Sequence, residues 1–253
     1  MEIAAEPPVG RPDAPVMHGQ RIDWTPKDVL FGALWFIFLF LLAPLPFVLP
    51  LLAVWDSDSS EIFVASLIVS AFSQVGLVVV AVRFTMHKYG GSWERLGFHR
   101  PSVGTFGWAA AAIFGALLWS AAYGGVIEWF DIDALRATCD EQIPADVQND
   151  VVLLTLTSIF VVTFAPVCEE TFFRGFVFPG LTKWGVPVAV AVSAGLFGIA
   201  HANYKALVPI LGIGMVFALA YLKSGNILTT VIAHFAFNCI SVTTLWAGDC
   251  EPS

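Results

Sequence analysis

Long apolar runs are the feature that most constrains how this chain can fold. They recur along its 253 residues, are about 20 residues long, and lack the alternation that the strands of a membrane barrel require. Only 13% of the residues are charged and 57% are hydrophobic, whereas soluble domains average about 25% charged residues. We therefore expect an all-α fold, a polytopic membrane-integral helical bundle with about seven transmembrane helices.

The expected helices follow from these runs and from the loops between them. Prolines at 44, 46 and 50 should bend or break the first helix, because proline removes a backbone donor. The predicted spans are 28–54, 61–85, 105–130, 151–180, 187–203, 206–222 and 226–247. The predicted organisation is a disordered tail over 1–24, transmembrane helices with loops over 25–150, a transmembrane core over 151–247 and a short tail over 248–253.

Basic residues in short loops indicate the orientation, since such loops stay in the cytoplasm. Alternate loops on one side carry most of the basic residues. The opposite side carries the acidic stretches "DSDSSE", 131–150 apart from Arg136, and "GDCEPS", together with Lys205. We expect a cytoplasmic N-terminus and an outer C-terminus in a prokaryotic cell membrane. The net charge of −8, without a basic patch, argues against a nucleic-acid partner. The basic loop residues are Arg11, Arg21, Lys27, Lys88, Arg95, Arg100, Lys183 and Lys223.

The cysteines have no C-x-x-C spacing and make neither a zinc set nor a dense disulfide framework. The predicted topology places Cys139 and Cys250 on the same outer side, where they could form a disulfide if that side is oxidising. Cys168 and Cys239 fall in apolar helices and are predicted to be packing residues.

The stretch "PVCEETFFRGF", residues 166–176, carries ionisable groups inside an apolar helix, where they must be paired, neutralised or turned toward a cavity. Successive helical residues turn by about 100°, so Glu169 and Glu170 face different directions. Glu170 and Arg174 are spaced i, i+4 and are predicted to form an internal ion pair. Glu169 must then find its partners on other helices.

Two histidines in apolar segments are the candidate partners. His201 lies in "LFGIAHANY", and His234 lies in "VIAHFAFN" with Asn238 on the same helical face. Measured from the ends of their helices at about 1.5 Å per residue, Glu169 lies roughly 16 Å deep, His201 roughly 20 Å and His234 about 12 Å. The three side chains can meet near mid-membrane, provided that the Glu169 helix continues to the "PG" at 179–180.

This set of residues is suited to hydrolysis of a peptide bond. A carboxylate or an imidazole can take a proton from water, and a second histidine with an amide can stabilise an oxyanion. Glu169, His201 and His234 could instead bind a metal such as zinc, with an open position for water. The motifs H-E-x-x-H and G-x-S-x-G and a Gly-rich phosphate loop are absent.

Three segments in order, "EETFFR", "FGIAH" and "HFAFN", closely resemble the E-E-x-x-x-R, F-x-x-x-H and H-x-x-x-N motifs of the CPBP family of intramembrane proteases. That family includes the CAAX prenyl endopeptidases and the Abi proteins of bacteriocin processing and immunity. The resemblance covers about residues 150–245 and makes 151–247 the expected catalytic core. It implies that Glu169 and His201 activate water, that His234 and Asn238 stabilise the oxyanion, and that Glu170, Arg174 and Phe197 support the site.

The expected substrate is a membrane-associated peptide or protein, with prenylated CAAX termini as one class that the residues do not select. We expect no required cofactor, with zinc as the alternative. The main rival function is a non-enzymatic immunity or scaffold protein that uses small-residue patches such as "GIG", 212–214, for close packing. A proton-coupled transporter is a third reading, although no inverted repeat is visible.

Overall fold

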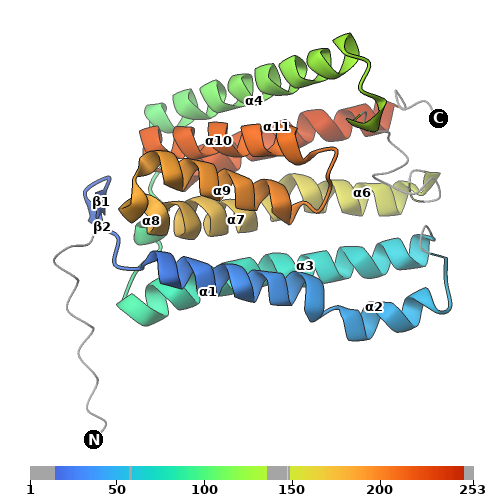
Figure 1. Ribbon diagram of the computed structural model, residues 1–253, viewed down its shortest axis with the longest axis horizontal. Coiled ribbons are helices and arrows are strands. Elements are labelled where there is room, and N and C mark those ends of the chain that lie inside the picture. The colour runs from blue at the N-terminus through green and yellow to red at the C-terminus, as the bar shows by residue number, and fades with distance from the viewer. Residues whose placement is uncertain (1–14, 57–58, 136–146, 148, 248–253) are drawn as a thin grey trace, which may run out of the picture.

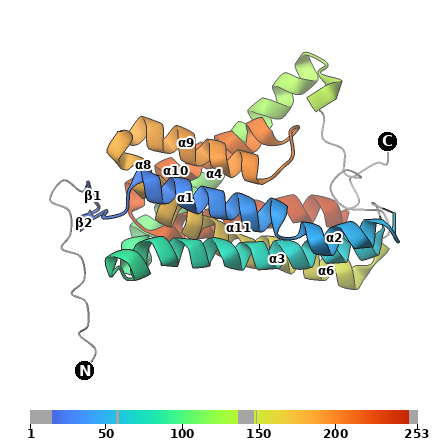
Figure 2. The ribbon, with the colours of Figure 1, turned by 60° about the horizontal axis from the view of Figure 1, so that its bottom comes forward.

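The computed structural model describes residues 15–56, 59–135, 147 and 149–247 of the chain. Its helices lie roughly along one common axis and form a single bundle (Figures 1 and 2). Within the described residues the fold is all-α apart from one small hairpin, as expected. In the described part of the chain, four helical segments are long and apolar enough to cross a membrane: Ser60–His87, Val103–Trp129, Val151–Trp184 and Leu207–Ser224. Shorter apolar helices cover Val186–Ala200 and Ile227–Thr243.

The first predicted span is broken, as its prolines indicated. Helix α1 (Pro26–Ile37) continues through a π-helical segment η1 (Phe38–Leu42), and after a turn at Pro44 the chain starts α2 (Leu45–Leu52). Side-chain hydroxyls cap the helices that follow, with Ser59 before α3 (Ser60–Val82) and Ser102 before α4 (Val103–Trp129). The shorter elements of this half are η2 (Arg83–His87), η3 (Glu94–Leu96) and η4 (Asp133–Leu135).

One long helical segment forms the centre of the second half of the molecule. It runs without a break from Val151 to Trp184, so the helix does continue well past Glu169. It consists of α6 (Val151–Ile159), η6 (Phe160–Phe164), α7 (Ala165–Glu170), η7 (Thr171–Val177), α8 (Phe178–Leu181) and η8 (Thr182–Trp184), with η6 and η7 π-helical. It is followed by α9 (Val186–Ala200), α10 (Leu207–Ser224) and α11 (Ile227–Ala247).

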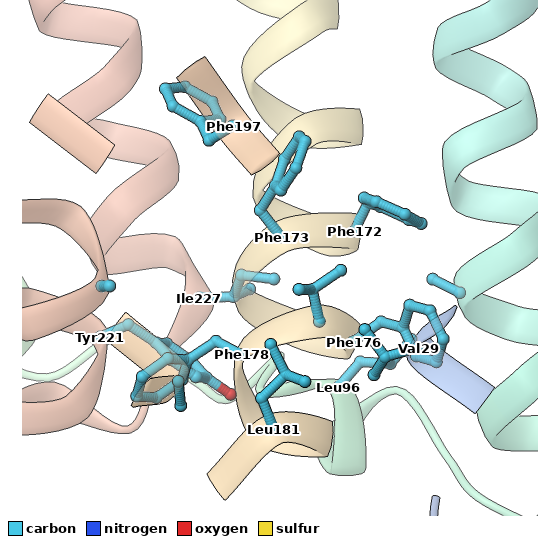
Figure 3. Packing of buried hydrophobic residues seen from close by; sticks show 14 of the residues in the cluster. Val29, Leu96, Phe172, Phe173, Phe176, Phe178, Leu181, Phe197, Tyr221 and Ile227 are labelled. Atoms are coloured by element: carbon cyan, nitrogen blue, oxygen red, sulfur yellow. The ribbon is translucent and has the colours of Figure 1, made fainter. Parts of the chain in front are cut away.

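The main hydrophobic core surrounds the part of this segment that follows the two glutamates. Every residue from Glu170 to Leu181 is buried, so this stretch is enclosed on all sides. The phenylalanines of η7 and α8 point toward different neighbours, including Val29 of α1, Leu96 of η3 and Tyr221 of α10 (Figure 3). Because these neighbours come from both halves of the sequence, the core holds the Val151–Trp184 segment (the site helix) in a fixed position between them.

The "GIG" patch at 212–214 serves packing inside the molecule. A Cβ on Gly212 would lie 2.0 Å from the indole nitrogen of Trp119 on α4, and a Cβ on Gly214 would lie 3.1 Å from Ala194 of α9. The Trp119 indole donates to the Pro209 carbonyl at 3.0 Å. The close approach of α10 to α4 and α9 therefore accounts for these glycines without a partner protein.

The predicted disordered tail is wrong for residues 15–24. Strands β1 (Val16–Met17) and β2 (Gln20–Arg21) pair as a hairpin, and the buried Trp24 that follows donates its indole N–H to the Phe176 carbonyl at 2.8 Å. The Asp23 carboxylate accepts from Arg95 at 2.8 Å. The segment looks polar because only Ile22 and Trp24 are buried apolar residues, and Asp23 separates them. The rest of the predicted tail, 1–14, lies outside the described residues.

Two further expectations concern the four cysteines. Cys139 and Cys250 both lie outside the described residues, so their pairing stays a prediction. Cys168 is a buried free thiol and Cys239 is a half-buried one, in keeping with packing roles.

Candidate active site

The two adjacent glutamates lie on different faces of the Val151–Trp184 helix, as their spacing indicated. The Glu169 carboxylate accepts a 2.6 Å hydrogen bond from the Gln74 amide of α3. The Glu170 carboxylate instead accepts from Arg174, one turn later, at 2.9 Å. The two carboxylates therefore belong to different environments, one half-buried beside α3 and one fully buried against α10 and α11.

The Glu170–Arg174 pair is shielded from solvent, since both side chains have an exposed fraction of 0%. Arg174 also donates to the Gly214 carbonyl at 3.1 Å, and its guanidinium lies 4.4 Å from the Phe197 ring centroid. A buried ion pair of this kind needs such additional hydrogen bonds to offset the loss of hydration. The pair is thus part of the packing between the site helix and α9 and α10.

Glu170 has a second partner that sequence spacing could not indicate. The Nδ1 atom of His234, on α11, lies 3.0 Å from the same Glu170 Oε1 atom that Arg174 contacts. A carboxylate only accepts, so the proton of this hydrogen bond belongs to Nδ1 of His234. Glu170 therefore determines the tautomer and the orientation of His234.

His201 lies just beyond the end of α9, because the helix stops at Ala200 rather than at 203 as predicted. The left-handed Ala202, with φ of 51°, turns the chain away at this point. The Nδ1 atom of His201 lies 2.8 Å from the Phe197 carbonyl, which can only accept. In the neutral ring, Nε2 is consequently left as a proton acceptor.

The Phe197 ring packs between His201, His234 and Arg174. Its ring lies 4.8 Å from that of His201 and 5.8 Å from that of His234, and it is almost completely buried. Its third neighbour is the Arg174 guanidinium. The phenylalanine of the F-x-x-x-H pattern therefore acts as a packing residue between both histidines and the ion pair.

The Asn238 side chain, one turn after His234, is held by the backbone of the site helix. Its Nδ2 atom donates to the Val161 carbonyl at 2.9 Å. An amide nitrogen carries two hydrogens, so one remains for another acceptor. The π-helical segment η6 places this carbonyl next to the cavity, a role for which π-bulges are often used.

A cavity of about 320 Å³ brings the predicted site residues together. Glu169, His201, His234 and Asn238 all line it, and they come from the site helix, the end of α9 and α11. Helices α1 and α3 close its other side. The remaining lining residues are Phe36, Ser70, Gln74, Leu77, Phe160, Val161, Ala165, Phe173 and Ala200.

Gln74 is the site residue that the sequence analysis missed. It is the hydrogen-bond partner of Glu169, and it lies in the long apolar segment Ser60–His87. Ser66, Ser70 and Gln74 are spaced at i, i+4 and i+8, so they share one face of α3. This polar stripe is the sequence signal that could have identified Gln74 as a site residue.

The metal alternative was tested against the donor atoms. Among the described residues, no three His, Cys, Asp or Glu side chains converge on a point where they could hold a metal ion. The Nδ1 atoms of His201 and His234 contact a carbonyl and a carboxylate, which would also suit histidines that bind a metal through Nε2. The misfit to a three-ligand site therefore rests on the lack of a converging set among the described residues.

Comparisons with known proteins find similarity to an endopeptidase family and to a protein named as a membrane peptidase. Residues 151–240 match the family model described as "Type II CAAX prenyl endopeptidase Rce1-like". The chain is 32% identical over 136 residues to the "Putative membrane peptidase YdiL" of Bacillus subtilis (strain 168), covering 53% of this chain and 54% of the relative. It is 34% identical over 89 residues to an "Uncharacterized 24.3 kDa protein" of Escherichia coli, covering 33% and 40%.

The matched part thus spans about half the length, or less, of these curated relatives. The segment that matches the family model, 151–240, contains every predicted site residue, from Glu169 to Asn238. No solved structure matches the chain.

Proposed function

We propose that the chain is an intramembrane endopeptidase, because residues 151–240 match the model of the Rce1-like type II CAAX prenyl endopeptidases. It would hydrolyse a peptide bond in a membrane-associated peptide or protein, with lipidated CAAX-type termini as one candidate class. The observation that carries the proposal is the single cavity lined by Glu169, His201, His234 and Asn238.

In the proposed mechanism Glu169 is the general base. One oxygen of its carboxylate accepts from Gln74, and its Oε2 atom has no hydrogen-bond partner within the described part of the chain. A water bonded to Oε2 and to Nε2 of His201 would have two acceptors for its protons. Transfer of a proton to Glu169 lets the oxygen attack the peptide carbonyl carbon, and the same proton later passes to the leaving amine.

His234 and Asn238 are the proposed donors to the oxyanion of the tetrahedral intermediate. The second amide hydrogen of Asn238 can serve directly. His234 must be doubly protonated to donate from Nε2, because Glu170 already receives the Nδ1 proton. The carboxylate of Glu170 stabilises that imidazolium, so the ion-pair cluster gains a role in the chemistry as well as in packing.

The proposed topology has seven crossings, with the α1–α2 pair counted as one, a cytoplasmic N-terminus and an outer C-terminus. The basic residues at one end of the bundle support it. Lys88 forms an ion pair with Asp28 there, and its pKa is raised because it donates a hydrogen bond to that carboxylate. Asp28 lies in the first turn of α1 and Lys88 directly follows η2, so both groups lie at the end of the bundle that is predicted to be cytoplasmic.

The first experiment compares membrane-protein termini by mass spectrometry in host cells that express the wild-type chain or Glu169→Gln at equal levels. Glu61→Gln is the matched control, because it makes the same change at an exposed position at the start of α3. New peptide ends produced by wild type and Glu61→Gln, and absent with Glu169→Gln, are expected. Identical termini in all three strains, with folded proteins, would favour the immunity or scaffold function.

A further inference from the structure

A second cavity, of about 360 Å³, adjoins the candidate active site. Ser70, Phe160 and Val161 line both cavities, so the two share a wall. The second cavity extends from there toward the end of the bundle where α3 and α6 begin and α11 ends (Figure 1). That end lies opposite the N-terminal hairpin. We call this second cavity the hydroxyl chamber; its other lining residues are Phe63, Ser66, Leu67, Thr157, Ser158, Ser241 and Val242.

The lining of the hydroxyl chamber is rich in hydroxyl groups. Three helical segments contribute them: Ser66 and Ser70 from α3, Thr157 and Ser158 from α6, and Ser241 from α11. Ser66 and Ser241 are exposed, whereas Thr157 is buried. Ser241 is three residues beyond Asn238 and therefore shares its face of α11. Ser70 is four residues before Gln74 and shares its face of α3. Polar faces that line the active site therefore continue into the chamber.

Thr157 indicates what the chamber contains. Hydroxyls in apolar helices usually bond the carbonyl four residues earlier, as Thr155 does to Val151 at 2.6 Å and Ser158 to Leu154 at 2.7 Å. The Thr157 side chain is only 8% exposed, yet its Oγ1 has no partner within the described residues. A buried hydroxyl without a partner costs about 1 to 3 kcal/mol, so a ligand that hydrogen-bonds is expected beside it.

Water is the ligand that fits this lining. The chamber volume far exceeds the roughly 10 to 15 Å³ that one water needs, and polar groups are available on each wall. The hydroxyls come from three helical segments, and Ser70 lies one turn beyond Ser66 along α3, so the lining suits several waters better than one ordered ligand.

We propose that the hydroxyl chamber is a water-filled passage that connects the active-site cavity with the bundle end opposite the hairpin. Water then reaches Glu169 from the bundle end opposite the hairpin. That this water is consumed in hydrolysis depends on the proposed function, whereas the passage itself does not.

Cysteine accessibility in membranes tests the passage without any need for activity. Ser66→Cys and Thr157→Cys place a thiol in the chamber wall. Ile68→Cys and Leu156→Cys are matched controls at nearly the same heights on the same helices, where the native side chains are 52% and 53% exposed on the outside of the bundle. A charged, membrane-impermeant methanethiosulfonate reagent is applied to one face of sealed vesicles. Intact mass then counts adducts beyond those of the wild-type chain.

Reaction of the chamber thiols at least about tenfold faster than the controls is expected, because only a hydrated thiolate reacts. The faster reaction should occur when the reagent is on the side opposite the hairpin. Equal rates for chamber and control positions would overturn the passage. Reaction only from the hairpin side would also overturn it, since the chamber would then fill through the active-site cavity.

The role of this water in hydrolysis has its own readout. Ser70→Leu narrows the shared wall and is expected to lower kcat about tenfold with little change in KM. Labelling of the chamber in a chain that cleaves nothing would uphold the passage and contradict the proposed function. Cleavage by a chain whose chamber thiols do not react would contradict the passage alone.

Discussion

Asn238 donates its side-chain amide to the backbone carbonyl of Val161 at 2.9 Å, and this bond joins α11 to the site helix. No backbone N–H of the site helix is placed to donate to the Val161 carbonyl. The N–H of Ala165, four residues later, donates to the Phe160 carbonyl instead, and Pro166, five residues later, has no N–H. The proline and the π-helical segment η6 thus create the acceptor that orients Asn238 beside the cavity.

Asn238→Ala should lower the free energy of unfolding by about 1 to 3 kcal/mol, since it leaves a carbonyl without a partner. In a Pro166→Ala background the loss should be smaller, because residue 166 then has an N–H that can reach Val161. Thermal unfolding of the two single variants and the double variant in detergent measures this coupling. Additive effects, with a coupling below about 0.5 kcal/mol, would show that the proline does not free the carbonyl.

Glu170→Gln and Glu169→Gln should separate stability from activity. The first leaves the buried Arg174 uncompensated and is expected to cost about 3 to 5 kcal/mol of stability, together with activity. The second changes a half-buried group outside the ion pair and should abolish cleavage with little loss of stability. Thermal unfolding midpoints of both variants, with Glu61→Gln as the exposed control, show which substitution lowers stability. Equal midpoints for the two variants would contradict the assignment of roles.

Gln74→Met removes the donor to Glu169 while nearly keeping the length of the side chain. We expect kcat to fall about tenfold to a hundredfold, because a loosely held base is misplaced by up to about 1 Å, with KM little changed. Val75→Met, at an exposed neighbouring position of α3, should retain wild-type kinetics. A rise in KM at constant kcat would instead place Gln74 in substrate binding.

Removal of metal ions should leave cleavage within about twofold of the untreated rate, because the described donors do not converge on a metal position. The measurement is cleavage after exhaustive treatment with a chelator, with metal content checked by elemental analysis. Loss of activity that added zinc restores would mean that Glu169, His201 and His234 rearrange into a metal site.

Trp24→Phe should destabilise the chain by about 1 to 3 kcal/mol, since it leaves the buried Phe176 carbonyl without the indole N–H. Val16→Ala, at an exposed position of the same hairpin, is the control and should be near neutral. Protease sensitivity of residues 15–24 measures the effect directly. Equal protection in both variants would show that the indole bond does not hold the hairpin on the bundle.

The amino-acid sequence by itself determined the features that depend on local periodicity. Apolar run lengths predicted the helices, the prolines predicted the break at Pro44, and the i, i+4 rule predicted the pairing of Glu170 with Arg174. The depths along each helix also predicted similar heights for Glu169, His201 and His234, and all three line one cavity. These results follow because a helix has a fixed rise and rotation per residue, whatever surrounds it.

The tertiary structure decided which helical faces meet. The contacts of Gln74 with Glu169, of His234 with Glu170 and of Asn238 with Val161 each join residues more than a whole helix apart. The hairpin at 15–24 was misjudged for the same reason, because its order comes from Phe176 and Arg95 and not from its own composition. Helix packing depends on side-chain shape and interhelical hydrogen bonds summed over the bundle, and no local pattern in the sequence carries that sum.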